Sequence, residues 1–184
     1  HTALDNQSKG VSYTLANALD LSNIQVLVPQ KNTLKQLTTY VPKQNYSQLL
    51  DKLYQSGAGV LGQYDECSFI THGKGSFRGN ENSQPHLGQK MVREKVNEIQ
   101  LNLIFKKHLE QKVIQTLFEN HPYEEVAYEL YSIDNSNQEI GMGSVGELKK
   151  ELNEKEFLTM VEEKLETKFL RHSAISDRKI KKVA

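Results

Sequence analysis

The feature that most limits the fold of this chain is a repeated change between strand-like and helix-like spacing of apolar residues. Residues 24–28 form a short β-branched run that ends at Pro29, which is typical of a strand. Helical spacing follows in two stretches separated by Pro42, with apolar stripes at Leu34, Leu37 and Val41 and then at Tyr46, Leu49, Leu50 and Leu53. We therefore expect a strand followed by a helical region that is interrupted at Pro42.

The remainder of this central region repeats the change of spacing. Strand character returns over residues 57–69, and closely spaced glycines then predict a hairpin or a long loop, at Gly73, Gly75 and Gly79. The following segments predict a strand over 99–105, a helix over 109–117 and a strand over 126–130. Residues 24–133 thus give the order β-α-β-β-α-β, which predicts an α/β (α+β) fold of the ferredoxin-like type with an antiparallel sheet.

The two flanks of this region have elements of their own. Residues 11–21 have helical spacing, and residues 141–146 are glycine-rich. A charged helix is predicted from Phe157, Val161 and Leu165 at i, i+4 and i+8, and a strand-like run follows it. We expect residues 1–21 and 135–184 to form one discontinuous α/β domain, into which residues 22–134 are inserted.

Composition excludes several classes of function. The chain has 23 basic and 23 acidic residues, so no net field attracts nucleic acid or an anionic membrane. Its apolar runs are far shorter than the roughly 20 residues that a membrane-spanning helix needs, and no segment predicts a signal peptide. Cys67 is the single cysteine and cannot form an internal disulfide. These features agree with a cytoplasmic protein.

Three motifs in order carry a resemblance to a known family. They are HTALD at residues 1–5, GAGVLGQYDECSF at 57–69 and HPYEEVAY at 121–128. Together they resemble the Nif-three-like dinuclear metal-centre proteins, whose bacterial members are GTP cyclohydrolase 1 type 2 homologues. The resemblance covers nearly the whole chain. It implies that residues 22–134 are an insert of the PII and CutA type within a metal-binding α/β core.

The first motif is the candidate for metal chemistry. An imidazole and a carboxylate at i and i+4 can converge on one ion, and a carboxylate can also bridge two. The family pattern HTxxD implies that His1 is a terminal ligand and Asp5 a bridging or terminal ligand. It also implies two divalent metal ions per full-length subunit, without distinguishing zinc, iron and manganese, and further ligands beyond the ends of this chain. We therefore expect the chain to be a piece of a longer protein. The residues alone leave the alternative that His1 comes from a purification tag and that Asp5 caps a helix.

The insert offers three candidate effector contacts. Gly73 to Arg78 could cradle a phosphate, with Lys74 and Arg78 adding charge, or could be a glycine-rich hairpin with solvated bases. His121 precedes Pro122, Tyr123 and two glutamates. It belongs either to an acid/base or effector-binding cluster or to a helix-to-strand connection in which it interacts with the last carbonyls of the helix.

Two classes of function follow from the resemblance. One is a metal-dependent hydrolase that acts on a nucleotide or phosphate ester. The other is a non-catalytic metal-binding scaffold or sensor whose insert binds an effector or governs assembly. In either class, the resemblance implies a closed homo-oligomer, a toroidal hexamer, and a small nucleotide or phosphate ligand.

Overall fold

The computed structural model describes residues 4, 6–7, 9–137 and 139–184. The chain divides into two compact units, each with its own core. Unit 1 comprises His1–Lys31 and Ser136–Ala184, and unit 2 comprises Asn32–Asn135. Among the described helices, none combines the length and the apolar character needed to span a bilayer.

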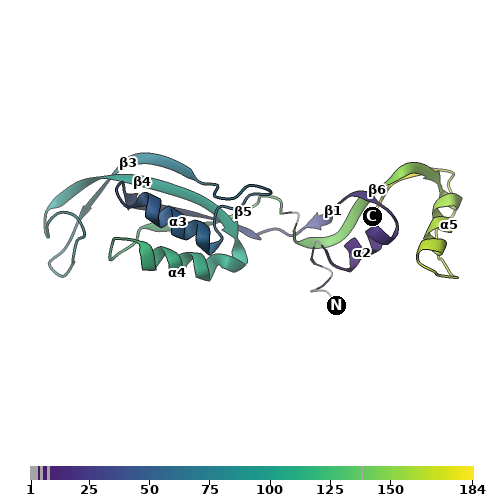
Figure 1. Ribbon diagram of the computed structural model, residues 1–184, viewed down its shortest axis with the longest axis horizontal. Coiled ribbons are helices and arrows are strands. Elements are labelled where there is room, and N and C mark those ends of the chain that lie inside the picture. The colour runs from purple at the N-terminus through teal and green to yellow at the C-terminus, as the bar shows by residue number, and fades with distance from the viewer. Residues whose placement is uncertain (1–3, 5, 8, 138) are drawn as a thin grey trace. The chain divides into compact units, whose positions relative to one another are not determined.

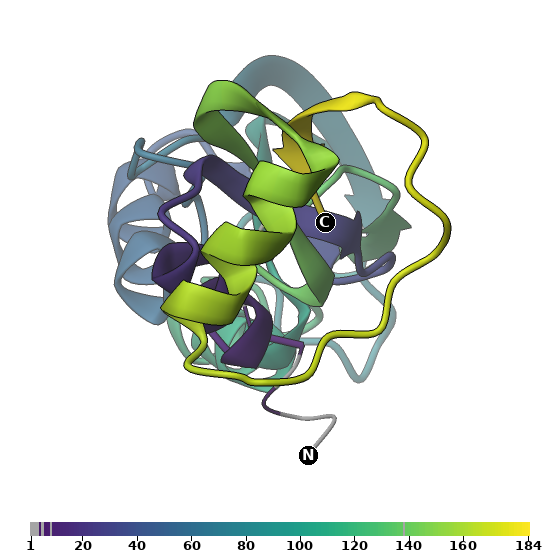
Figure 2. The ribbon, with the colours of Figure 1, turned by 90° about the vertical axis from the view of Figure 1, so that its right-hand side faces the viewer.

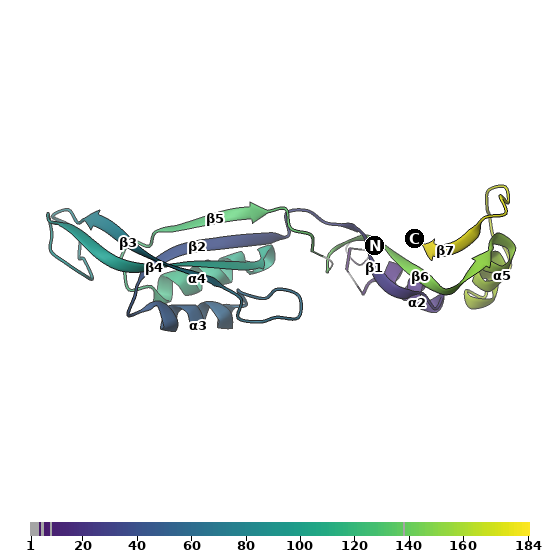
Figure 3. The same ribbon diagram turned by 90° about the horizontal axis from the view of Figure 1, so that it is seen from above.

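Unit 2 is a four-stranded antiparallel sheet with both helices on one face, as Figures 1 and 3 show. Its strands lie in the order β3-β4-β2-β5, and the chain order is β-α-β-β-α-β. The elements are β2 (Leu34–Pro42), α3 (Tyr46–Ser56), β3 (Phe69–Arg78), β4 (Arg93–Lys106), the short 3₁₀ turn η1 (Lys107–Leu109), α4 (Glu110–Asn120) and β5 (Tyr128–Ile133). This arrangement confirms the predicted ferredoxin-like fold.

The core of unit 2 lies between the sheet and its two helices. Alternate residues of β4, from Ile99 to Phe105, are at most 1% exposed and face the helices. Leu53 of α3 and Leu117 of α4 pack against them and are fully buried. Gly57 ends α3 in the left-handed conformation at φ 101°, which favours glycine. The helix and strand spacing that predicted these elements therefore reports their buried faces.

The helix predicted over Leu34 to Val41 is wrong, because this segment is strand β2. Leu34, Leu37 and Val41 fit a helical stripe, but Leu37, Thr39 and Val41 are all fully buried with the period of two that a strand gives. β2 lies between β4 and β5, in register with both over most of its length. Burial in the centre of a sheet and the β-branched residues of the segment outweigh the helical spacing.

The predicted strand at residues 24–28 exists but belongs to a different sheet. It lies in β1 (Ser22–Pro29), which pairs with β6 (Gly141–Asn153) in unit 1, whereas the strand predicted at 126–130 lies largely in β5 of unit 2. The expectation that both belong to one sheet is therefore wrong. The first strand of the ferredoxin-like unit is β2. A short apolar run indicates a strand without indicating its partner.

The glycine-rich segment also differs from its prediction. Strand character was predicted over 57–69, but β3 begins only at Phe69 and continues through Gly73 and Gly75 to Arg78. β3 forms a long antiparallel hairpin with β4, in unbroken register from Phe69↔Asn102 to Arg78↔Arg93. Figure 3 shows these two strands extending past the ends of α3 and α4. The hairpin alternative therefore describes this segment, and it is a strand rather than an anion-binding loop.

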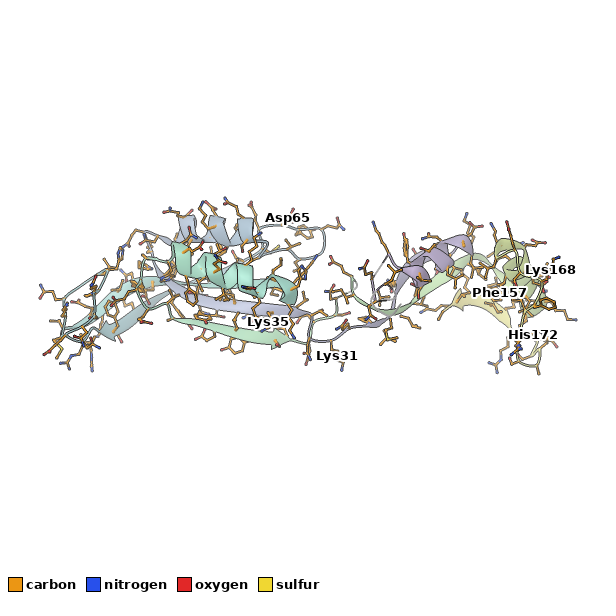
Figure 4. All side chains as sticks on the ribbon, turned by 90° about the horizontal axis from the view of Figure 1, so that it is seen from below. Lys31, Lys35, Asp65, Phe157, Lys168 and His172 are labelled. Atoms are coloured by element: carbon orange, nitrogen blue, oxygen red, sulfur yellow. The ribbon has the colours of Figure 1, made fainter. Side chains whose placement is uncertain are left out.

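Unit 1 is a three-stranded antiparallel sheet in the order β1-β6-β7, with β7 at Lys179–Val183. Helices α2 (Val11–Ala18) and α5 (Glu154–Lys164) contribute to its small core, where Phe157 packs (Figure 4). Asn153 and Glu156 form a reciprocal capping box at the start of α5. Figure 2 shows the extended segment that leads from α5 back to β7. The predicted helices and the last strand are thus present, with slightly different bounds.

Candidate functional site

Unit 2 contains a cavity of about 680 Å³ outside its core. Its floor is the sheet face that the helices leave uncovered. Ile99 packs against the helices, so its neighbours Glu98 and Gln100 face the other way. Tyr40 and Thr71 are in register with Gln100 on either side and share this face. The walls come from the two connections that follow β3 and α4, over residues 79–86 and 123–127.

Glu98 is the carboxylate on this floor, and two neighbours fix its position. Its Oε1 accepts a hydrogen bond of 2.8 Å from the Tyr123 hydroxyl. Its carboxylate also lies directly over Gly75, where a Cβ atom would collide with the carboxyl carbon and with Oε2. Burial raises the pKa of Tyr123 well above its ordinary value, and the hydrogen bond to Glu98 raises it further. Tyr123 therefore stays a neutral donor to Glu98 over the physiological range.

His121 supports the wall of the cavity rather than lining it. It is 8% exposed, and its Nε2–H donates to the Tyr40 carbonyl at 3.0 Å. Its Nδ1 accepts from the Tyr123 backbone N–H at 3.1 Å, which assigns the ring proton to Nε2. Burial lowers the pKa of His121, while the bond to Tyr40 and the charge of Glu98 oppose that shift. The side chain thus joins the 121–127 connection to β2, and it does not bind the last carbonyls of α4.

The wall of the cavity is aromatic. The Tyr123 ring makes edge contacts with Phe77 at 6.0 Å and with His86 at 6.2 Å between ring centroids. The Gln84 backbone N–H donates to Glu124 Oε1 at 2.8 Å and so ties the β3–β4 connection to the one that follows α4. Two chain segments that lie far apart in sequence are therefore held together around one opening.

Lys74 and Arg78 border the same cavity through β3. Both side chains are exposed, and they alternate with Gly73, Gly75 and Phe77. Because successive residues of a strand point to opposite faces, the two bases point away from the floor that carries Glu98. The structure thus brings Lys74, Arg78 and His121 into one region without directing them at one point. Their contact with an effector stays a prediction.

The two predicted metal ligands, His1 and Asp5, lie outside the described residues. Within the described part of the chain, no three His, Cys, Asp or Glu side chains are grouped closely enough to hold a metal ion. The described residues therefore do not by themselves fit a dinuclear centre.

Sequence reasoning missed Glu98, Tyr40 and the role of Gly75. Tyr123 was visible as part of the HPYEE motif, but Glu98 is one polar residue in an alternating strand. Only the register of β3 with β4 places its carboxylate over Gly75.

Comparison with known proteins places the whole chain in one family. A family model described as Duf34/NIF3 (NGG1p interacting factor 3) matches residues 1–184. A "GTP cyclohydrolase 1 type 2 homolog" of Bacillus subtilis (strain 168) is 40% identical over 185 residues, which cover 100% of this chain and 50% of that protein. Its counterpart in Halalkalibacterium halodurans is 33% identical with the same coverage.

A solved structure agrees with these matches. A Bacillus cereus protein related to NIF3 superposes with a TM-score of 0.81 at 33% identity, covering 99% of this chain and 48% of that one. The chain thus spans about half the length of the curated relatives it matches. Because both the family model and the relatives cover it from end to end, the chain belongs to the Duf34/NIF3 family.

Proposed function

We propose that unit 2 is an effector-binding module and that the full-length protein is a metal-binding scaffold or sensor under its control. The observation that supports this function is the cavity of about 680 Å³, which falls in the size range of small-molecule sites. Its lining combines aromatic side chains with polar and charged ones, which could fix the orientation of a ligand. The cavity lies in unit 2, which corresponds to most of the insert that the sequence predicts.

Filling the cavity tests this proposal. A Cβ atom on Gly73 would meet no atom within 4 Å, and Gly73 lines the cavity, so Gly73→Trp should occupy the space without straining β3. The full-length wild type and this variant are compared by thermal unfolding against a panel of nucleotides, amino acids and polyamines. We expect at least one compound to raise the Tm of the wild type and not that of the variant. Equal shifts in both proteins, or no shift in either, would contradict effector binding in this cavity.

A second candidate function is hydrolysis of a nucleotide or phosphate ester. Membership of the family and the name shared by its bacterial relatives favour it. We propose two divalent metal ions per full-length subunit, with zinc, iron or manganese as candidates. Such a pair supplies activated water near neutral pH. His1 and Asp5 would contribute to holding it, together with residues of the full-length protein outside this chain.

Metal analysis of full-length variants tests the second candidate. If Asp5 bridges two ions, Asp5→Ala removes a shared negative charge, whereas His1→Ala removes one neutral ligand. Asp5→Ala should therefore lose more metal, and Lys74→Ala in unit 2 should keep the wild-type content. The same preparations are assayed for hydrolysis of GTP and of phosphate esters. Equal metal content in Asp5→Ala and wild type would refute the bridging role.

We also propose that the full-length protein assembles as a toroidal homohexamer in the cytoplasm. The family resemblance supports this assembly, and closed rings are a common form of homo-oligomer. Light scattering on the full-length protein measures the number of subunits. A mass other than that of six subunits would overturn the hexamer without affecting the effector proposal.

A further inference from the structure

The cavity of unit 2 has a chemical preference that its charges and contacts define. We propose that it binds an organic cation with a flat, unsaturated body, and that the Glu98 carboxylate holds the positive group. This inference rests on the proposed effector-binding function and names the class of effector.

One of the two carboxylate oxygens of Glu98 is available to accept a hydrogen bond from a ligand. Its Oε1 is occupied by the Tyr123 hydroxyl, but within the described part of the chain no hydrogen bond reaches its Oε2. The carboxylate is half-buried on the cavity floor and is held over Gly75. A ligand ammonium or guanidinium group would complete its hydrogen bonding through a charge-assisted bond, which is about twice as strong as a neutral one.

The walls suit a cation as well as a flat ring. The rings of Tyr123, Phe77 and His86 form a contiguous aromatic surface beside Glu98. The faces of Tyr and Phe rings attract cations, and a flat body can pack against them. The space, at about 680 Å³, holds a ligand larger than a bare metal ion.

The charges around the cavity favour a cation over a phosphate. Two further acidic residues, Glu124 and Glu125, line the cavity, and the Gln84 N–H holds Oε1 of Glu124. At the sheet positions that form the floor, the residues facing the cavity include no Lys or Arg, because Lys74 and Arg78 alternate to the other face of β3. The backbone N–H groups of this segment lie in a strand rather than in an anion-binding loop. An anionic effector would therefore face the carboxylates.

Calorimetric titration of the full-length protein with matched probes tests the inference. Tyramine carries an ammonium group on a flat ring. Para-ethylphenol is its neutral analogue, para-hydroxyphenylacetate its anionic analogue, and ATP represents phosphate ligands. We expect tyramine to bind at least about tenfold more tightly than para-ethylphenol, with the two anions weaker still.

Variants assign the effect to Glu98. Glu98→Gln keeps the acceptor for Tyr123 but removes the charge, so it should lower tyramine affinity by about tenfold and leave para-ethylphenol unchanged. Glu119→Gln on the exposed surface of α4 removes one negative charge away from the cavity and should bind tyramine as the wild type does.

The outcomes distinguish a wrong class of ligand from the absence of effector binding. Unchanged tyramine affinity in Glu98→Gln, or tighter binding of ATP or para-hydroxyphenylacetate than of tyramine, would overturn the cation assignment. If that anion binding is lost in Gly73→Trp, effector binding stands and only its class is wrong. If no probe binds and the panel of compounds shifts no Tm, both proposals fail.

Discussion

The Tyr123 hydroxyl donates a 2.8 Å hydrogen bond to Glu98, which joins a residue that follows α4 to one in the middle of β4. The same carboxylate occupies the space that a side chain at Gly75 would need. Three segments of unit 2 therefore meet at one side chain.

Removing the Tyr123 hydroxyl should cost stability. Tyr123→Phe keeps the ring contacts with Phe77 and His86 but leaves the Glu98 Oε1 without its donor. We expect the free energy of unfolding to fall by about 1 kcal/mol, as measured by chemical denaturation. Tyr64, which is 74% exposed, provides the control: Tyr64→Phe should change stability by less than about 0.5 kcal/mol. A Tyr123→Phe variant as stable as that control would contradict the prediction.

Two glycines of β3 should respond oppositely to alanine. Gly75→Ala places a Cβ against the Glu98 carboxylate, whereas Gly73→Ala enters open space. Gly73→Ala should be neutral or stabilise the fold by up to about 1 kcal/mol, because it restricts the unfolded chain. Gly75→Ala should destabilise the fold by about 1 kcal/mol, because the Glu98 carboxylate must move and gives up its hydrogen bond with Tyr123.

A double variant identifies the cause of that cost. In Gly75→Ala combined with Glu98→Ala, the clashing carboxylate is absent, so most of the stability lost in Gly75→Ala should return relative to Glu98→Ala alone. Denaturation curves of the four proteins complete the cycle. Additive losses would show that the clash with Glu98 is not the reason.

His121 should make stability depend on pH. Because burial lowers its pKa below the ordinary 6.5, the unfolded chain binds this proton more readily than the folded one. Its contribution is therefore fully present above about pH 6.5 and is lost as the pH falls toward the lowered value. Protonation also occupies the Nδ1 that accepts from the Tyr123 N–H. The Tyr40 carbonyl and the Tyr123 ring contact the imidazole, and the charges of Glu98 and His86 also act on it.

Unfolding at a series of pH values checks this dependence. The wild type should lose stability between about pH 7 and pH 5 more steeply than His121→Gln, which carries no titratable group at this position. His72→Gln changes an exposed histidine of β3 and serves as the comparison. Parallel curves for wild type and His121→Gln would show that the histidine does not titrate with folding.

The core of unit 2 should depend strongly on Leu37. This side chain is fully buried between the sheet and the helices, so Leu37→Ala leaves a cavity and should cost about 3 kcal/mol. Leu61→Ala, at a side chain that is 50% exposed, should cost less than about 1 kcal/mol. Hydrogen exchange should show lost protection in β2 and β4 of unit 2. An equal loss in β1 and β6 would contradict separate cores.

The sequence determined the class of fold because spacing reports buried faces. The alternation from Ile99 to Phe105 and the helical repeat from Leu109 to Leu117 each describe a surface that packs into the core. The motifs also determined the family, which the match over residues 1–184 confirms. These properties are local, so they can be seen without knowing which segments meet.

Only the tertiary structure decided which strands pair. Spacing alone predicts the wrong sheet for residues 24–28 and a helix instead of a strand for Leu34 to Val41. The reason is that a short apolar segment is stabilised by neighbours that lie far along the chain. The candidate site likewise depends on contacts between segments that lie far apart in the sequence. Glu98 lies over Gly75 and beneath Tyr123 only because β3 and β4 pair in one register and the connection after α4 reaches the uncovered face. Spacing fixes which face of an element is buried, whereas long-range pairing brings separate elements together.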